Sequence, residues 1–173
     1  MGAIFFRRSS VLHVALLAFA LGIGQPAGPL VLTDQYDHEF HLDDLRGSVV
    51  ILIVGDRTGS DYMSAWSHGI RARYKAQEYP QLKIVPVANL ASVPGFLHGF
   101  VKKKFLSKDP AHPASPIQLD WQGAVAQRFG FHNGVTNVYV IDRDGVLQYE
   151  GSGKGTEAEL ERLFQGLESL LAR

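Results

Sequence analysis

A short polar turn carries the side chains in this sequence that are best suited to binding a charged group. Its members are Asp56, Arg57, Thr58 and Ser60. The turn directly follows six aliphatic residues, Val49–Val54. A guanidinium group, two hydroxyls and the free N–H groups at the start of a following helix would together bind a small anion or a carboxylate. In the simpler alternative, the hydroxyls only cap that helix, and Arg57 pairs with Asp56 or Asp61.

The sequence gives weaker support to a metal site or a catalytic serine triad than to anion binding at the polar turn. His38 and His41 are separated by two residues and lie near Asp37, Asp43 and Asp44. The segment has an extended pattern, in which these two imidazoles point to opposite faces, so we predict no metal site. Metal carriage by this segment remains a third alternative for function. No G-x-S-x-G turn presents a serine for a catalytic triad, and we predict neither catalytic residues nor a cofactor.

The composition excludes several classes of function. The chain has 173 residues and no cysteine, so a disulfide, a thiolate nucleophile and a cysteine-bound metal are all impossible. Its 17 basic and 17 acidic residues give no electrostatic reason to expect a nucleic-acid partner. The length indicates one domain with a sizeable core.

The N-terminal 28 residues have the layout of a secretory signal peptide. Arg7 and Arg8 precede the apolar stretch Val11–Gly24, and small residues follow. That stretch is short for a membrane span, so we predict a signal peptide at 1–28 and one domain at 29–173. The alternative is an uncleaved anchor in the inner membrane. After cleavage, 15 basic and 17 acidic residues remain, and we expect a periplasmic or otherwise exported protein without a stable membrane span.

Val49–Val54 is the element that must position the polar turn. It shows no polar alternation, which is typical of a strand buried on both faces of a sheet. Apolar residues then recur at spacings of three and four, at Met63, Trp66, Ile70 and Tyr74. This pattern predicts a helix with Ser60 as its N-cap that ends near Tyr79, before Pro80.

Strands and helices alternate along the rest of the chain. We expect strands at 30–33, 39–42, 82–90, 117–119, 137–141 and 146–150, and helices at 94–106, 123–129 and from a capping box at Thr156 and Glu159 to the C-terminus. Asp144-Gly145 predicts a hairpin between the last two strands. Helices between buried strands predict an α/β fold, with a mixed, mostly parallel sheet flanked by helices and a C-terminal hairpin plus helix.

The predicted helix at 94–106 carries both an apolar stripe and a run of three lysines. The stripe consists of Phe96, Leu97, Phe100, Val101 and Phe105. Lys102–Lys104 lies beside it. The lysines could contact acidic lipid or protein, but a solvated helix face is the simpler interpretation.

The mature chain resembles the thioredoxin-like superfamily in its redoxin and TlpA-like branch. The matching pieces are Leu42–Gly47, the strand Val49–Val54, Phe129-Gly130-Phe131 and the run Val138–Gly145, which ends like the family's "IDRDG". The segment Gly55–Ser60 is similar to the glycine-arginine-threonine/serine segment of YtfJ-type exported proteins. The resemblance implies a thioredoxin-like fold.

The chain departs from this family at both hallmarks of thiol chemistry. Redox members have a cysteine or a CxxC pair where this chain has Thr58–Asp61, and a cis-proline at the place of Thr136. The resemblance implies that Thr136 and Asn137 face the polar turn. The candidate ligand-binding set is therefore Asp56, Arg57, Thr58, Ser60, Thr136 and Asn137.

The sequence thus predicts an exported thioredoxin-fold protein without redox cysteines. We expect a binding or accessory module of the cell envelope whose partner is a protein or a small anionic ligand. The alternative is a redoxin-type enzyme that uses a partner's thiols, or that carries out non-thiol chemistry at Arg57, Ser60 and Thr136. Thiol–disulfide or peroxidase activity through the chain's own cysteine is excluded.

Overall fold

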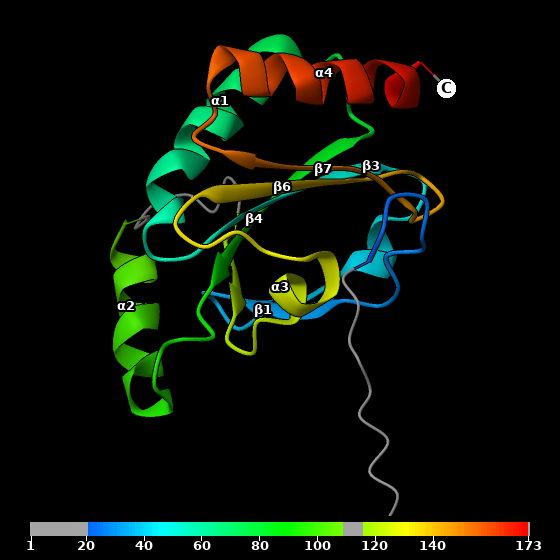
Figure 1. The fold of residues 1–173 in the computed structure, drawn as a ribbon. Coiled ribbons are helices and arrows are strands. Elements are labelled where there is room, and N and C mark those ends of the chain that lie inside the picture. The colour runs from blue at the N-terminus through cyan, green and yellow to red at the C-terminus, as the bar shows by residue number, and fades with distance from the viewer. Residues whose placement is uncertain (1–20, 109–115, 173) are drawn as a thin grey trace, which may run out of the picture.

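The computed structural model describes residues 21–108 and 116–172, whose strands form one mixed sheet (Figure 1). The strands are β1 (Val31–Asp34), β2 (Glu39–His41), β3 (Val49–Gly55), β4 (Leu82–Asn89), β5 (Gln118–Asp120), β6 (Thr136–Ile141) and β7 (Leu147–Gly153). The helices are α1 (Met63–Arg73), α2 (His98–Lys108), α3 (Ala124–Phe129) and α4 (Glu157–Leu171), with short 3₁₀ turns at Leu42–Leu45, Gly59–Tyr62 and Gly95–Leu97. No helix among these residues combines the length and apolar content needed to cross a bilayer.

The direction of β6 corrects one prediction about the sheet. The strand order is β2-β1-β5-β4-β3-β6-β7. β4 is parallel to β3 and to β5, whereas the other four neighbouring pairs are antiparallel. The sheet is mixed, as predicted, but the expectation that it is mostly parallel is wrong. The six residues of α3 span only about 9 Å. The loop after it stays at the carboxyl edge of the sheet, where the Gly134 N–H donates to Asp56, so β6 starts at that edge and runs antiparallel to β3.

β3 lies at the centre of the sheet and is buried along its whole length. Alternate residues starting at Val49 pack in one apolar cluster with α1 and α4. The residues between them, starting at Val50, pack in a second cluster with α3. Figure 1 shows α1 and α4 together on one face of the sheet and α3 on the other. The prediction of a strand buried on both faces is confirmed.

α1 is shorter than the sequence predicts. The predicted apolar face is buried, but the helix ends at Arg73 instead of near Tyr79. Tyr74 leaves the helical conformation with φ −116° and ψ 88°. Its ring packs edge-on against Tyr79 and Phe164, with centroid distances of 5.0 and 5.6 Å. Packing of this aromatic side chain therefore ends the helix before the proline that the sequence predicts as its stop.

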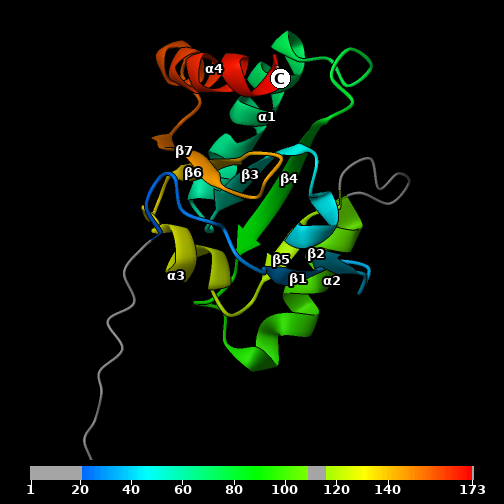
Figure 2. The same ribbon diagram turned by 90° about the vertical axis from the view of Figure 1, so that its right-hand side faces the viewer.

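One edge of β4 is only partly paired. Residues 87–89 pair with β5, whereas residues 82–86 pair only with β3 in the described structure. Figure 2 shows the long β4 ribbon extending beyond β5. A groove of about 510 Å³ lies beside this stretch, and Phe40, Tyr74, Tyr79 and Pro116 are among the residues that line it. Pro86 lies within the stretch.

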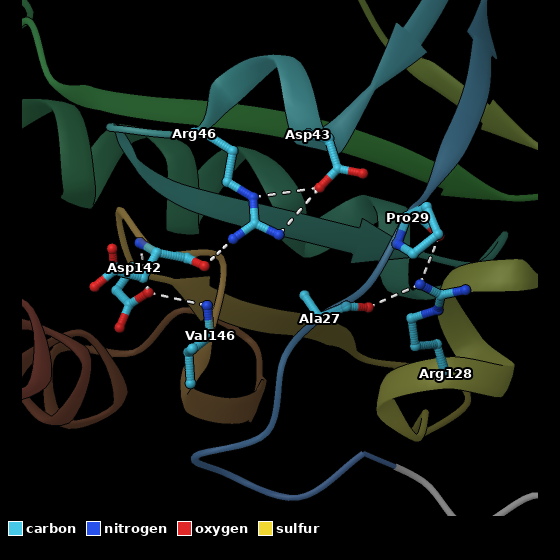
Figure 3. Close-up of polar contacts among 8 residues, drawn as sticks. Ala27, Pro29, Asp43, Arg46, Arg128, Asp142 and Val146 are labelled. Carbon is cyan, nitrogen blue, oxygen red and sulfur yellow. Dashed lines mark hydrogen bonds and ion pairs between the residues drawn. The ribbon is translucent and has the colours of Figure 1, made fainter.

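Residues 21–28, which the sequence places in the N-terminal leader, pack on the domain. Ala27 is buried, and its N–H donates to the carbonyl of Gly145 at 2.8 Å. The Arg128 guanidinium donates to the carbonyls of Ala27 and Pro29 at 2.7 and 2.6 Å (Figure 3). The described fold therefore begins ahead of residue 29. Residues 1–20 of the predicted signal peptide lie outside the described residues.

The predicted Asp-Gly hairpin is confirmed, and its geometry explains the "IDRDG" run. Asp142 Oδ1 accepts from the N–H groups of Asp144 and Val146 at 3.0 and 2.9 Å (Figure 3). Gly145 adopts φ 74°, a left-handed conformation that favours glycine. Arg46 donates to the Asp144 carbonyl. The run is therefore a turn that joins β6 to β7 and fastens it to the segment before β3.

The predicted capping box at the start of α4 is present and affects a pKa. The Glu159 carboxylate accepts from the N–H groups of Thr156 and Lys154 at 2.8 and 3.1 Å. Partial burial alone would raise the pKa of Glu159, but the hydrogen bonds outweigh it and lower that pKa below its ordinary value of 4.5. Since the folded-state pKa is the lower one, the stabilisation is present above about pH 4.5 and is lost as the pH falls through the folded-state pKa.

We expect Glu159→Gln to lower the melting temperature at pH 7 by roughly 1–4 °C, because neutral hydrogen bonds from Thr156 and Lys154 would replace charge-assisted ones, a loss of about 1 kcal/mol. The difference from the parent chain should shrink below pH 4.5. Thermal unfolding followed by circular dichroism between pH 3 and pH 7 measures both effects. Glu157→Gln, in the same helical turn but outside the capping box, is the control and should show a smaller change. A Glu159→Gln difference of equal size at pH 3 and pH 7 would contradict this role.

Candidate functional site

Asp56 lies at the carboxyl end of β3 and organises the polar turn. Its Oδ1 atom accepts from the backbone N–H groups of Thr58 and Gly59 at 3.1 and 2.7 Å. Its Oδ2 atom accepts from the N–H of Gly134 at 2.8 Å. Gly134 belongs to the loop between α3 and β6, so one carboxylate connects the start of the 3₁₀ turn to the entry of the neighbouring strand. Three N–H donors hold this negative charge in one position.

The N–H groups predicted to bind an external anion are thus already bound to a carboxylate of the chain itself, that of Asp56. Two backbone donors at the helix start bind Asp56, and the Ser60 N–H bonds to the Asp56 carbonyl at 2.8 Å. The prediction that Ser60 caps α1 is wrong, because the Ser60 hydroxyl donates to the Arg57 carbonyl at 2.9 Å and the α-helix begins only after the 3₁₀ turn. An external anion would have to bind to side chains rather than to these N–H groups.

Arg57, Thr58 and Ser60 are exposed at the surface of the turn. Among the ion pairs of the described residues none involves the Arg57 guanidinium, so the alternative in which it pairs with Asp56 or Asp61 is wrong. The reason is that both Asp56 oxygens point to backbone donors. The exposed part of the site therefore consists of one cation and two hydroxyl groups.

Thr136 and Asn137 are fully buried at the start of β6, where they hold the loop between α3 and β6 in place opposite the polar turn. The Thr136 hydroxyl donates to the Gly59 carbonyl at 2.7 Å. The Asn137 side chain accepts from the N–H of His132 at 2.8 Å and donates to the carbonyls of His132 and Val135 at 3.0 and 3.2 Å. The structure places Thr136 against Gly59 of the polar turn, where the resemblance implies that it lies, whereas the Asn137 side chain bonds to the loop before β6. Their polar groups are used inside the protein.

The loop between α3 and β6 is a part of the site that the sequence did not single out. Gly59 packs so closely on it that a Cβ atom there would lie 2.3 Å from the Val135 carbonyl oxygen. Gly134, at φ 80°, supplies the third donor to Asp56. The Asn133-Gly134 pair is a turn signal that marks this loop in the sequence. Tyr139 lies behind it, where its hydroxyl donates to the Gly130 carbonyl and burial raises its pKa.

No group of three or more histidine, aspartate or glutamate side chains that could hold a metal ion gathers within residues 21–108 and 116–172. His38 pairs with Asp34, and His41 pairs with Glu39, both at 3.2 Å. The two histidines that form the sequence's only candidate metal pair thus contact different carboxylates. The described arrangement offers hydrogen bonds and charge at the polar turn.

We expect Gly59→Ala to destabilise the protein by about 1–3 kcal/mol, because the new methyl group overlaps the Val135 carbonyl and forces the two walls of the site apart. Urea unfolding followed by tryptophan fluorescence gives the free energy of unfolding. Gly99→Ala is the matched control, since a Cβ at Gly99 meets nothing within 4 Å and the residue lies in helix α2. That variant should be neutral or slightly more stable. Equal effects of both substitutions would contradict the close packing at Gly59.

Solved structures of redox proteins resemble this fold. A Chlorobium tepidum protein described as a thiol:disulfide interchange protein, DsbE, superposes with a TM-score of 0.65 at 25% identity over 88% of this chain and 99% of that chain. The thioredoxin domain of a thiol-disulfide oxidoreductase from Bacteroides vulgatus gives 0.61 at 15% identity, over 88% and 99%. The exposed lipoprotein thioredoxin of Streptococcus pneumoniae gives 0.60 at 15% identity, over 80% and 98%.

No protein-family model and no curated protein matches the sequence. The structural likeness, the central buried strand and the C-terminal strand and helix agree with the fold that the sequence resemblance implies. The protein therefore has a thioredoxin-like fold, in a chain that contains no cysteine.

Proposed function

We propose that this protein is a binding or accessory module that works without thiol chemistry. The observation that carries the proposal is the Asp56 carboxylate, which accepts three N–H groups at the carboxyl end of the central strand. Helix starts in redox proteins lower the pKa of a cysteine and so favour its thiolate. Here the helix-start donors bind the Asp56 carboxylate, which cannot form a disulfide or reduce a peroxide.

The exposed side chains of the turn define the ligand class. Arg57 has a planar guanidinium that can bind a carboxylate or phosphate through two parallel hydrogen bonds, and the Thr58 and Ser60 side chains lie beside it in the chain. Asp56 is half-buried and bonded to the backbone, so it fixes the shape of the turn. We propose a small anionic ligand, or an anionic group on a protein partner, as the occupant. Thr136 and Asn137 would support the site from behind.

We propose that this binding takes place outside the cytoplasm, in the cell envelope. The proposal is supported by the charged and apolar layout of residues 1–28 and by the similarity of Gly55–Ser60 to YtfJ-type exported proteins. An exposed lipoprotein thioredoxin is among the proteins with a similar fold. An uncleaved N-terminal anchor would give the same location.

A thermal-shift screen of the full chain against oxyanions, carboxylates and nucleotides tests the ligand class. A ligand present at a hundred times its Kd adds about 2.7 kcal/mol, which raises the melting temperature by roughly 5–10 °C. We expect this shift to vanish in Arg57→Ala and to persist in Arg162→Ala, which removes an exposed arginine from α4. A shift of equal size in both variants would remove the turn from consideration as the binding site.

The enzyme alternative is supported only by the shared fold, and it predicts turnover. We expect no reduction of insulin and no consumption of peroxide above the background rate of glutathione or dithiothreitol alone, because the chain supplies no sulfur. Turnover that Arg57→Ala abolishes without changing the melting temperature would favour a redoxin-type enzyme acting with partner thiols. The Bacteroides vulgatus thioredoxin domain would be a suitable positive control.

A further inference from the structure

Helix α2 and the 3₁₀ turn before it expose an unusual amount of apolar surface. Phe96 is 86% exposed, Phe100 is 58% exposed and Leu97 is 37% exposed. The only other large apolar side chains exposed in the described residues, Ile23 and Val31, lie in other segments. Apolar surface concentrated in this way commonly marks an interaction site. The sequence predicts one apolar stripe here, but the structure buries only part of it.

The inner face of α2 is firmly attached to the domain. Val101 and Phe105 pack on the apolar cluster beneath the helix. The His98 ring stacks on Trp121 with a centroid distance of 4.0 Å. Lys102 pairs with Asp37, outside the helix. These contacts fix the rotation of α2 about its axis, so the opposite face is held outward by the fold.

That outward face combines aromatic and basic side chains. Phe96, Phe100, Lys103 and Lys104 follow at helical spacings of three and four, and both lysines are exposed. The Lys104 ammonium lies 4.8 Å from the centre of the Phe100 ring. No acidic residue occurs between Leu90 and Lys108. We call these four residues the aromatic–lysine face.

We propose that the aromatic–lysine face docks on an anionic phospholipid surface. Phenylalanines flanked by lysines are the composition by which helices lie at a membrane interface, where the rings enter the headgroup region and the ammonium groups meet anionic lipid. Helix α2, which carries three of the four residues of this face, lies at the end of the molecule far from α4 (Figures 1 and 2).

The size and charge of the aromatic–lysine face argue against two other occupants, a folded protein partner and a second copy of this chain. From Phe96 to Lys104 the helix is only about 12 Å long, whereas a stable protein interface uses roughly 20–30 residues on each side. Two copies meeting through this face would gather four lysines in one small interface, and no acidic residue between Leu90 and Lys108 could offset their repulsion. A lipid surface is deformable and anionic, so it needs neither a matching groove nor a large area.

Because the chain has no cysteine, one introduced cysteine is the only labelling site in the full chain. A single cysteine is introduced by Phe96→Cys or by Phe100→Cys, and labelled with a polarity-sensitive fluorophore. Gln77→Cys, at an exposed turn after α1, is the control position. Vesicles of phosphatidylglycerol mixed with phosphatidylethanolamine should shift the emission at positions 96 and 100 to the blue, and nitroxide-labelled lipid should quench it. Position 77 should not respond, even if residues 1–20 also bind the vesicles.

A charge reversal on the face distinguishes binding to anionic lipid from non-specific membrane binding and from self-association. Lys103→Glu with Lys104→Glu should weaken the response at position 96 by roughly 30-fold or more, since each lysine near an anionic surface contributes about fivefold in affinity. Lys154→Glu with Arg162→Glu changes the net charge equally and should leave the response intact. An equal response at position 77, an equal response to phosphatidylcholine vesicles, or a response to protein concentration without vesicles would overturn the proposal. The last result would indicate self-association through this face.

Discussion

The carboxylate of Asp56 is the interaction on which the carboxyl edge of the sheet depends. It binds the first N–H groups of the 3₁₀ turn and the Gly134 N–H of the loop before β6. Two segments separated by more than seventy residues are therefore held by one side chain at the end of the buried central strand. The Thr136–Gly59 hydrogen bond adds a second link between the same walls. Because these bonds are internal, the geometry of the turn does not require a ligand.

The hydrogen bonds around Asp56 show how a thioredoxin-like fold can exist without thiol chemistry. Thiol exchange requires a sulfur atom that can be attacked and can leave, and a thioredoxin-like fold supplies only the position and the electrostatic field around it. A carboxylate benefits from the same N–H donors, because any anion near a helix start is stabilised. It has no comparable reactivity. In this chain, which has no cysteine, the turn exposes Arg57, Thr58 and Ser60, the groups through which we propose that a ligand binds.

Features set by local sequence could be predicted, and features set by distant contacts could not. The strand Val49–Val54, the Asp-Gly hairpin and the Thr156–Glu159 capping box follow from short-range patterns, and all are present. Capping by Ser60 was a reasonable expectation, but Asp56 competes for the same donors with the help of Gly134. The early end of α1 depends on rings that come from α4 and from the following turn.

The direction of β6 is also set by a distant contact, since the loop before it is bound to Asp56 at the carboxyl end of β3. The burial of Asn137 is similar, because its amide bonds to a loop whose path is not visible in the sequence. Thr136 contacts the turn as the resemblance implies, but the sequence could not reveal that the polar groups of Thr136 and Asn137 are already bonded inside the protein.

The partly paired edge of β4 has a consequence for how this protein behaves at high concentration. Unpaired strand edges recruit strands from other molecules and so start aggregation. Residues 82–86 have no second strand partner within the described structure, yet Pro86 supplies no N–H for such pairing and Lys83 places a charge on the stretch. A proline and a lysine in these five residues thus discourage the sheet from growing beyond one molecule, and the gap beside β4 can persist without becoming a site of aggregation.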